Sequence, residues 1–208
     1  MQQSVPSAVP QPGAILRYNR GAVIIHWVTA LLLLMQIYIG FTFSDMPRGP
    51  DRSFVFEWHR TWGVLILLLA LFRLGWRMAH RPPPYPPELP RWERLAATWN
   101  HRAFYFLLIV LPLTGLMAIS SGRSMTTLAG GIPFPLIPGV SEALSDRMGE
   151  VHETLVTITL VLIALHVGAA LKHQFIDGRR GRAAGRMWPF KARDGSPSVE
   201  VHSGTDIG

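Results

Sequence analysis

The sequence predicts an all-α integral membrane protein, a four-helix bundle with both termini in the cytoplasm. Hydrophobic residues make up 49% of the 208 residues, whereas charged residues make up only 16%. The apolar residues gather in four runs, each close to the roughly twenty residues that cross a bilayer as a helix. Lysine and arginine gather on one side of these runs, and the positive-inside rule assigns that side to the cytoplasm.

The four apolar runs are too long and too continuous for the strands of a barrel, so they are predicted to be helices. The first is longer than a signal-peptide core and no A-x-A-like cleavage site follows it, so it is expected to be retained. Residues 1–16 are rich in Pro and Gln and are expected to be disordered, as is the basic cytoplasmic tail, residues 177–208. Residues 17–176 then form one transmembrane domain, with helices at about 22–43, 59–80, 103–121 and 151–172.

Two connections between these helices are distinctive. The stretch "RPPPYPPELP" follows the second helix, and its prolines favour a stiff polyproline-like strap. The loop after the third helix is long and rich in Gly, Pro and apolar residues. We expect it to fold down as a cap on the outer end of the bundle, with a short helix around 140–150.

The formal net charge of +7 could indicate nucleic-acid binding, but its distribution favours another explanation. Fifteen of the twenty Lys and Arg residues fall on the predicted cytoplasmic side. The excess is therefore a topology signal, with some attraction to anionic lipid. No recognition motif accompanies the charge, so nucleic acid is not an expected partner. The absence of cysteine excludes a disulfide framework, thiolate-bound iron–sulfur clusters and covalently attached c-type haem.

Four of the eight histidines lie inside the apolar runs or at their ends, in a depth-matched pattern. His26 and His166 fall toward the cytoplasmic side, whereas His59 and His152 fall toward the outer side. His152 and His166 are fourteen residues apart, so they share one helix face within about 40° and stand about 21 Å apart along the axis. His26 is therefore at the depth to meet His166, and His59 at the depth to meet His152.

Two facing imidazoles suit a metal with two axial positions, and haem iron is such a metal. The small residues Gly168, Ala169 and Ala170 are expected to leave room for a flat macrocycle beside His166. Zinc fits less well because it requires four ligands and few acidic residues lie at these depths. The alternative is a non-redox membrane protein whose histidines only hydrogen-bond to neighbouring helices.

The sequence resembles the bacterial cytochrome b561 family, which are four-helix membrane cytochromes with two b-type haems. The resemblance covers roughly residues 17–190 and rests on "YNRGAVIIHW", "WHRTWG", "LPLTGLM", "VHETL" and "LHVGAALKHQF", in the family's order. It implies that His26 and His166 bind the cytoplasmic-side haem iron, and that His59 and His152 bind the outer one. It also implies a multi-pass protein of the bacterial inner membrane, in contact with lipid. Val151 departs from the Trp frequent in relatives, but that position packs near the haem and does not bind it.

The resemblance extends to weaker candidates. In superoxide-oxidising members of the family, the position of His173 lies at a ubiquinone site, and an imidazole can donate to a quinone carbonyl there. The alternative for His173 is a solvated interfacial residue beside Lys172. His101 could line the same pocket, although a position in the headgroup layer is the simpler expectation. The possible partners of the haem propionates are Arg20, Arg73 and Arg77.

The expected function is electron transfer across the membrane, because histidines on both axial positions leave the iron no site for oxygen. The first hypothesis is an oxidoreductase that takes electrons from an outer-side donor, superoxide or similar, and passes them to ubiquinone. The outer segments carry seven acidic residues against five arginines, so no overall positive field steers an anion there. The second hypothesis is a membrane subunit that relays electrons for a larger dehydrogenase or hydrogenase complex, or for a soluble cytochrome.

Overall fold

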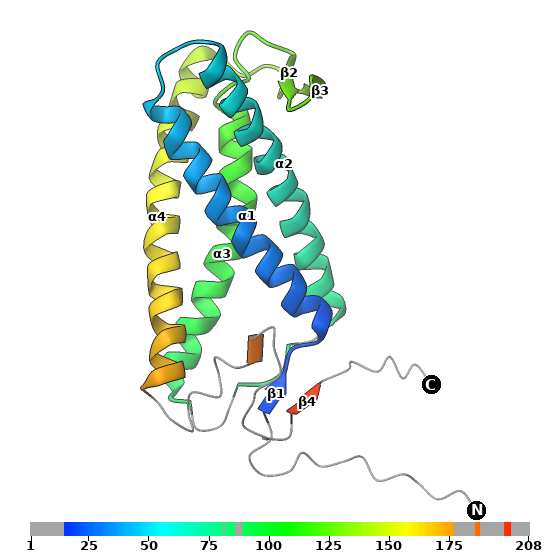
Figure 1. The fold of residues 1–208 in the computed structure, drawn as a ribbon, viewed down its shortest axis with the longest axis vertical. Helices are drawn as coiled ribbons and strands as arrows, with labels where there is room; N and C mark the ends of the chain where they lie inside the picture. Colours follow the sequence, from blue (N-terminus) through cyan, green and yellow to red (C-terminus); the bar gives the residue numbers. More distant parts are fainter. Residues whose placement is uncertain (1–14, 81, 86–88, 177–185, 188–197, 201–208) are drawn as a thin grey trace, which may run out of the picture.

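The computed structural model describes residues 15–80, 82–85, 89–176, 186–187 and 198–200. Within these residues, four long helices stand side by side as a bundle (Figure 1). They are α1 (Arg20–Asp45), α2 (Pro50–Ala79), α3 (Arg91–Met117) and α4 (Glu142–Phe175). All four are long and apolar enough to cross a membrane. The predicted all-α four-helix membrane fold is therefore confirmed.

Three of the helices begin well before the apolar runs that predicted them. The runs mark the part of each helix that lies in hydrocarbon, whereas the start is set by capping residues farther out. Pro50 occupies the first turn of α2, and Pro90 immediately precedes α3. The Ser141 side chain accepts a hydrogen bond from the Leu144 N–H at 3.3 Å and caps α4. The short helix expected around 140–150 is thus not separate, because those residues are the first turns of α4.

The most buried apolar layer lies halfway along the bundle. Ile66 and Ala70 of α2 are 2% and 0% exposed, and they pack with Leu108 of α3. Leu32, Leu33 and Ile109 pack around this layer. Other large apolar side chains point outward, as a surface solvated by lipid tails requires, and these include Leu31, Leu68 and Leu165.

A β-hairpin covers one end of the bundle, which we call the hairpin end (Figure 1). Strands β2 (Met125–Leu128) and β3 (Ile132–Pro135) pair antiparallel. Gly130 and Gly131 turn the chain between them with φ of 80° and 74°, which glycine adopts without strain. The long loop is thus an ordered cap, as expected.

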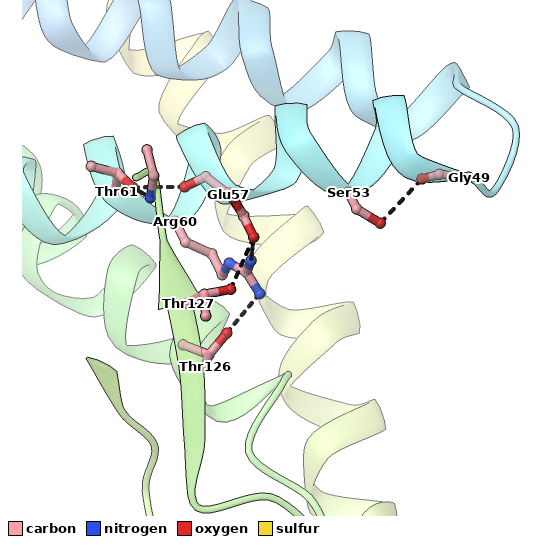
Figure 2. Close-up of polar contacts among 8 residues, drawn as sticks. Gly49, Ser53, Glu57, Arg60, Thr61, Thr126 and Thr127 are labelled. Carbon is pink, nitrogen blue, oxygen red and sulfur yellow. Dashed lines mark hydrogen bonds and ion pairs between the residues drawn. The ribbon is translucent and has the colours of Figure 1, made fainter. Parts of the chain in front are cut away.

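Three polar contacts tie the hairpin to one face of α2, and we call them the hairpin clamp (Figure 2). They are Arg60 Nη1 to Thr126 Oγ1 at 2.6 Å, Thr127 Oγ1 to Glu57 Oε1 at 2.9 Å and Ala129 N to Thr61 Oγ1 at 2.8 Å. Positions 57, 60 and 61 are three and four residues apart, so they share one helix face. The clamp therefore fixes the hairpin to α2 along the turn of the helix that carries His59.

At the opposite end of the bundle, which we call the terminal end, part of the C-terminal segment folds back (Figure 1). Strand β1 (Ile15–Arg17) pairs in parallel with β4 (Ser198–Glu200). Both strands include residues from the segments expected to be disordered, 1–16 and 177–208. Apart from residues 15–16, 186–187 and 198–200, these two segments lie outside the described residues. Residues 82–85 of the proline stretch form no helix or strand, in agreement with the expected strap.

The tail clasp, residues 186 and 187, packs against the terminal end. Arg186 is only 5% exposed and donates to the Pro83 carbonyl at 2.7 Å. Its guanidinium lies 5.6 Å from the centre of the Tyr18 ring, and Trp27 Nε1 donates to the Met187 carbonyl at 2.8 Å. Burial lowers the pKa of Arg186 and raises the pKa of Tyr18. Three distant segments of the chain are thus joined at one point.

Candidate functional site

The structure brings the four intramembrane histidines together as two pairs. His26 of α1 faces His166 of α4, and their ring centres are 6.3 Å apart. His59 of α2 faces His152 of α4, also with ring centres 6.3 Å apart. Each pair joins α4 to a different helix, and the apolar layer around Ile66 lies between the two levels on α2. These are the pairs that the helix spacing predicted.

The spacing within each pair fits a metal ion between two imidazoles. A metal–nitrogen bond of about 2 Å on each side places the two nitrogens about 4 Å apart. Each ring centre lies about 1 Å behind its nitrogen, so the two centres should be roughly 6 Å apart. Both pairs meet this requirement. Among the described residues no group of three or more His, Cys, Asp or Glu could hold a metal, so the two-histidine arrangement is typical of haem iron and not of zinc.

His152 is held in a defined orientation at the hairpin end. Its Nδ1 lies 2.9 Å from the Leu111 carbonyl, so Nδ1 carries the proton and donates it. Thr114 Oγ1 is 3.3 Å from the same nitrogen. A hydrogen bond at Nδ1 orients the ring and leaves Nε2 as the metal-binding atom, the usual arrangement for a ligating histidine.

His59 has one polar neighbour on α1, the side chain of Gln36. Gln36 Nε2 donates to the His59 carbonyl at 2.9 Å and lies 3.3 Å from His59 Nε2. His59 Nδ1 and Gln36 Oε1 are both buried without a hydrogen-bond partner in the structure. Unpaired buried polar atoms are costly, and they mark sites where a ligand or cofactor changes the pairing.

Two glycines leave the space that the hairpin-end pair occupies. A Cβ on Gly40 would lie 3.2 Å from His59 Cε1, and one on Gly115 would lie 3.1 Å from His152 Cε1. Open space lies beside the small residues expected to make room near His166, since a Cβ on Gly168 would meet nothing within 4 Å and residues 168–170 are exposed.

Two arginines stand beside the terminal-end pair. Arg73 Nη2 is 3.1 Å from His26 Nδ1, and the guanidinium groups of Arg73 and Arg77 each lie 5.7 Å from the Tyr105 ring centre. Within the described part of the chain neither forms an ion pair. Their uncompensated positive charge fits the carboxylates of a haem, which need cationic partners. Arg20 opens α1, and its side chain is exposed.

His101 lies inside the bundle end. The ring centre of His101 is 5.7 Å from that of His166. The Phe104 ring packs against the His166 imidazole, with ring centres 5.5 Å apart. α3 begins ten residues before His101, at Arg91, so His101 lies within the helix and not at its start, as the apolar run had indicated.

His173 lies in the last turn of α4 with Lys172 beside it. Both approach Glu93, which belongs to the first turn of α3. Lys172 Nζ is 2.9 Å from Glu93 Oε1, and His173 Nε2 is 3.9 Å from Glu93 Oε2. The His173 side chain is only 16% exposed, so it is not a solvated surface residue.

Sequence reasoning missed several residues of the site. Gln36 is a lone amide in the uncharged run "LLLLMQIYIG", and a polar side chain there is itself a signal of function. Glu93 and Tyr105 carry no comparable signal, because only the rotation of α3 reveals their neighbours. The two facing histidine pairs, the arginines and the glycine spaces belong to one class of protein, a helical membrane bundle with the side chains that commonly hold haem iron.

Comparison with known proteins agrees with this class. The model of the family described as prokaryotic cytochrome b561 matches residues 17–189, so the chain belongs to that family. Cytochrome b561 homolog 1 of Escherichia coli (strain K12) is 29% identical over 169 residues, covering 77% of this chain and 92% of that protein. Cytochrome b561 homolog 2 of the same organism is 27% identical over 164 residues, covering 77% and 86%.

A third relative carries a more specific name. The protein named probable superoxide oxidase CybB from Yersinia pestis is 27% identical over 164 residues, covering 77% of this chain and 90% of its own length. Membership of the family implies b-type haem and electron transfer in the membrane. The chain is accordingly a multi-pass bacterial membrane cytochrome.

Proposed function

We propose that this protein carries electrons across the bacterial inner membrane through two b-type haems, from an outer-side donor such as superoxide to ubiquinone. The observation that supports it most strongly is the pair of histidine pairs, each with ring centres 6.3 Å apart, at two levels of one bundle. One bound haem supplies reversible one-electron chemistry at each level. His26 and His166 would hold one, and His59 and His152 the other.

The residues around the two pairs orient the histidines and supply charge. His152 is oriented by the Leu111 carbonyl, which fixes the tautomer that binds metal through Nε2. Arg73 and Arg77, which lie over the Tyr105 ring, would supply positive charge to the haem carboxylates. A haem held between two histidines would have no free position for oxygen, so each pair suits electron transfer.

The orientation follows from charge. The terminal end carries most of the lysines and arginines, so it is the cytoplasmic side. The His26–His166 pair is then the cytoplasmic-side site, and the His59–His152 pair faces the outer donor. His173 lies seven residues after His166, in the last turn of α4, and is the candidate for the ubiquinone contact.

The test is to purify the protein in mild detergent, add ubiquinone and a superoxide source, and follow haem absorbance together with quinol formation. We expect rapid haem reduction and quinol production, both abolished by superoxide dismutase. If superoxide leaves two bound haems oxidised, the donor proposal is wrong.

A relay for a protein donor is the second candidate. The outer segments hold more acidic residues than arginines, and the hairpin exposes Met125 and Ile132 at 48% and 58%. An acidic surface with exposed apolar side chains favours a docking protein over steering of an anion. A partner that co-purifies with the protein and reduces its haems would support this function.

A further inference from the structure

We propose that Glu93 is the residue that enables His173 to deliver protons to a reduced quinone at the cytoplasmic end of the bundle. The inference rests on the proposed function, since it assigns a role within the quinone contact of His173. Ubiquinone needs two protons as well as two electrons to become ubiquinol. The structure must therefore provide protons next to the point where electrons leave.

The two carboxylate oxygens of Glu93 face two different partners. Oε1 pairs with Lys172 Nζ at 2.9 Å, which anchors the carboxylate. Oε2 is turned to His173 and lies 3.9 Å from Nε2. One cation therefore holds the carboxylate in place while its second oxygen faces the imidazole. A carboxylate at this distance balances the positive charge that appears when the imidazole takes up a proton.

Glu93, Lys172 and His173 lie at helix ends whose dipoles match their charges. Glu93 is in the first turn of α3, where the helix dipole favours negative charge. Lys172 and His173 are in the last turn of α4, where the dipole favours positive charge. The two helix ends thus support a carboxylate facing a protonated imidazole, and neither dipole opposes this distribution.

Access to water decreases from Lys172 to His173 and Glu93. The side chain of Lys172 is 43% exposed, whereas those of His173 and Glu93 are 16% and 11% exposed. Protons can enter from the cytoplasmic water at Lys172 and reach His173 in a site that is largely closed. A shielded donor protects a reduced quinone from water while it is still supplied with protons.

Two superoxide ions become two O2 and release two electrons, which the proposed function delivers to the quinone. For each electron accepted, the Nδ1–H bond of the His173 imidazolium breaks and an O–H bond forms on a quinone oxygen. His173 is left neutral beside the Glu93 carboxylate, and it takes the next proton from cytoplasmic water. Two such cycles give one quinol.

The experiment separates proton delivery from electron delivery. The haem-loaded protein is reduced without oxygen and then mixed rapidly with decylubiquinone, which needs protons, or with ferricyanide, which needs none. For Glu93→Gln we expect reoxidation by decylubiquinone to slow about 100-fold, the lower end of what general acid–base assistance contributes. Reoxidation by ferricyanide should stay within about twofold of the wild-type rate. Glu93→Asp, which keeps the charge, should recover most of the decylubiquinone rate.

The matched control is Glu150→Gln, which removes a 77% exposed carboxylate at the hairpin end and should change neither rate. Equal slowing of Glu93→Gln with both acceptors would mean a structural role and would overturn the inference. A fast Glu93→Gln beside a slow His173→Gln would also overturn it, while leaving His173 at the quinone. If wild-type protein reacts with ferricyanide but not with decylubiquinone, the proposed acceptor itself is wrong and the role of Glu93 fails with it.

Discussion

At the scale of single residues, the two histidine pairs make independent predictions because they lie at different levels. Under the proposed function, replacing one member would remove a haem ligand from one site and leave the other site intact. His166→Ala should therefore reduce the haem content from two per chain to about one, and His59→Ala should do the same for the other haem. The measurement is haem per protein by pyridine haemochrome.

His80→Gln is the control for these variants, because His80 stacks on Trp76 with ring centres 4.3 Å apart and belongs to neither pair. It should keep the full haem content. Loss of both haems in His166→Ala at unchanged protein yield would contradict the idea of two separate sites.

Gly115 gives a second prediction at this scale. A methyl group added there would lie 3.1 Å from His152 Cε1, so the imidazole must shift. Overpacking of this kind costs about 1–3 kcal/mol, and here the cost falls on the ligand orientation set by the Leu111 carbonyl. Gly115→Ala should weaken haem binding at the hairpin-end pair and alter its electron paramagnetic resonance signal.

The matched control is Gly75→Ala on α2, an exposed position where the added Cβ meets nothing within 4 Å. It should leave both haem signals unchanged. An unaltered spectrum in Gly115→Ala would mean that His152 has more room than the structure indicates.

At the scale of elements, the hairpin clamp should govern how tightly the cap is held to α2. Thr61→Val keeps the shape of the side chain but removes the acceptor of the Ala129 N–H. An unsatisfied backbone donor costs about 1–3 kcal/mol, so the hairpin should open more often. Hydrogen–deuterium exchange of residues 125–135 should then accelerate. Thr154→Val, which removes an exposed hydroxyl bonded within α4, should leave that exchange unchanged.

The tail clasp makes a prediction about pH. Burial raises the pKa of Tyr18 from its ordinary value of 10.0, so the folded protein favours the neutral phenol. The stability that this provides is fully present below pH 10 and is lost as the pH rises through the raised pKa. Thermal unfolding of the wild-type protein should therefore weaken above pH 10 more than that of Tyr18→Phe, which cannot ionise. Parallel curves for the two proteins would mean that the phenol ionises without penalty.

The elements also show why the sequence predicted some features and not others. The pairing of His26 with His166 followed from depth alone, since bilayer thickness and helix rise fix where each residue lies along the membrane normal. The contacts of Gln36, Gly115 and Glu93 depend on how each helix is rotated about its axis. Rotation is set by packing among many side chains, so no local pattern revealed it. The tail clasp was missed because its residues lie in a polar, Gly-rich segment without periodicity.

At the scale of the whole molecule, the proposed direction of electron flow depends on which end of the bundle faces the cytoplasm. The distribution of Lys and Arg places the terminal end there. Because the chain has no cysteine, single cysteines can report this orientation without background. Met125 is exposed on the hairpin, and Arg91 is exposed at the start of α3.

In intact spheroplasts, a membrane-impermeant maleimide should label Met125→Cys and leave Arg91→Cys unlabelled until the membrane is broken. The opposite pattern would place the His59–His152 pair on the cytoplasmic side. An outer donor would then reach His26 and His166 first, and the cluster of Glu93, Lys172 and His173 would face away from the cytoplasmic proton supply. Orientation thus decides which histidine pair receives electrons, and whether the structure has its proton-handling residues on the side where quinol formation draws protons from the cell.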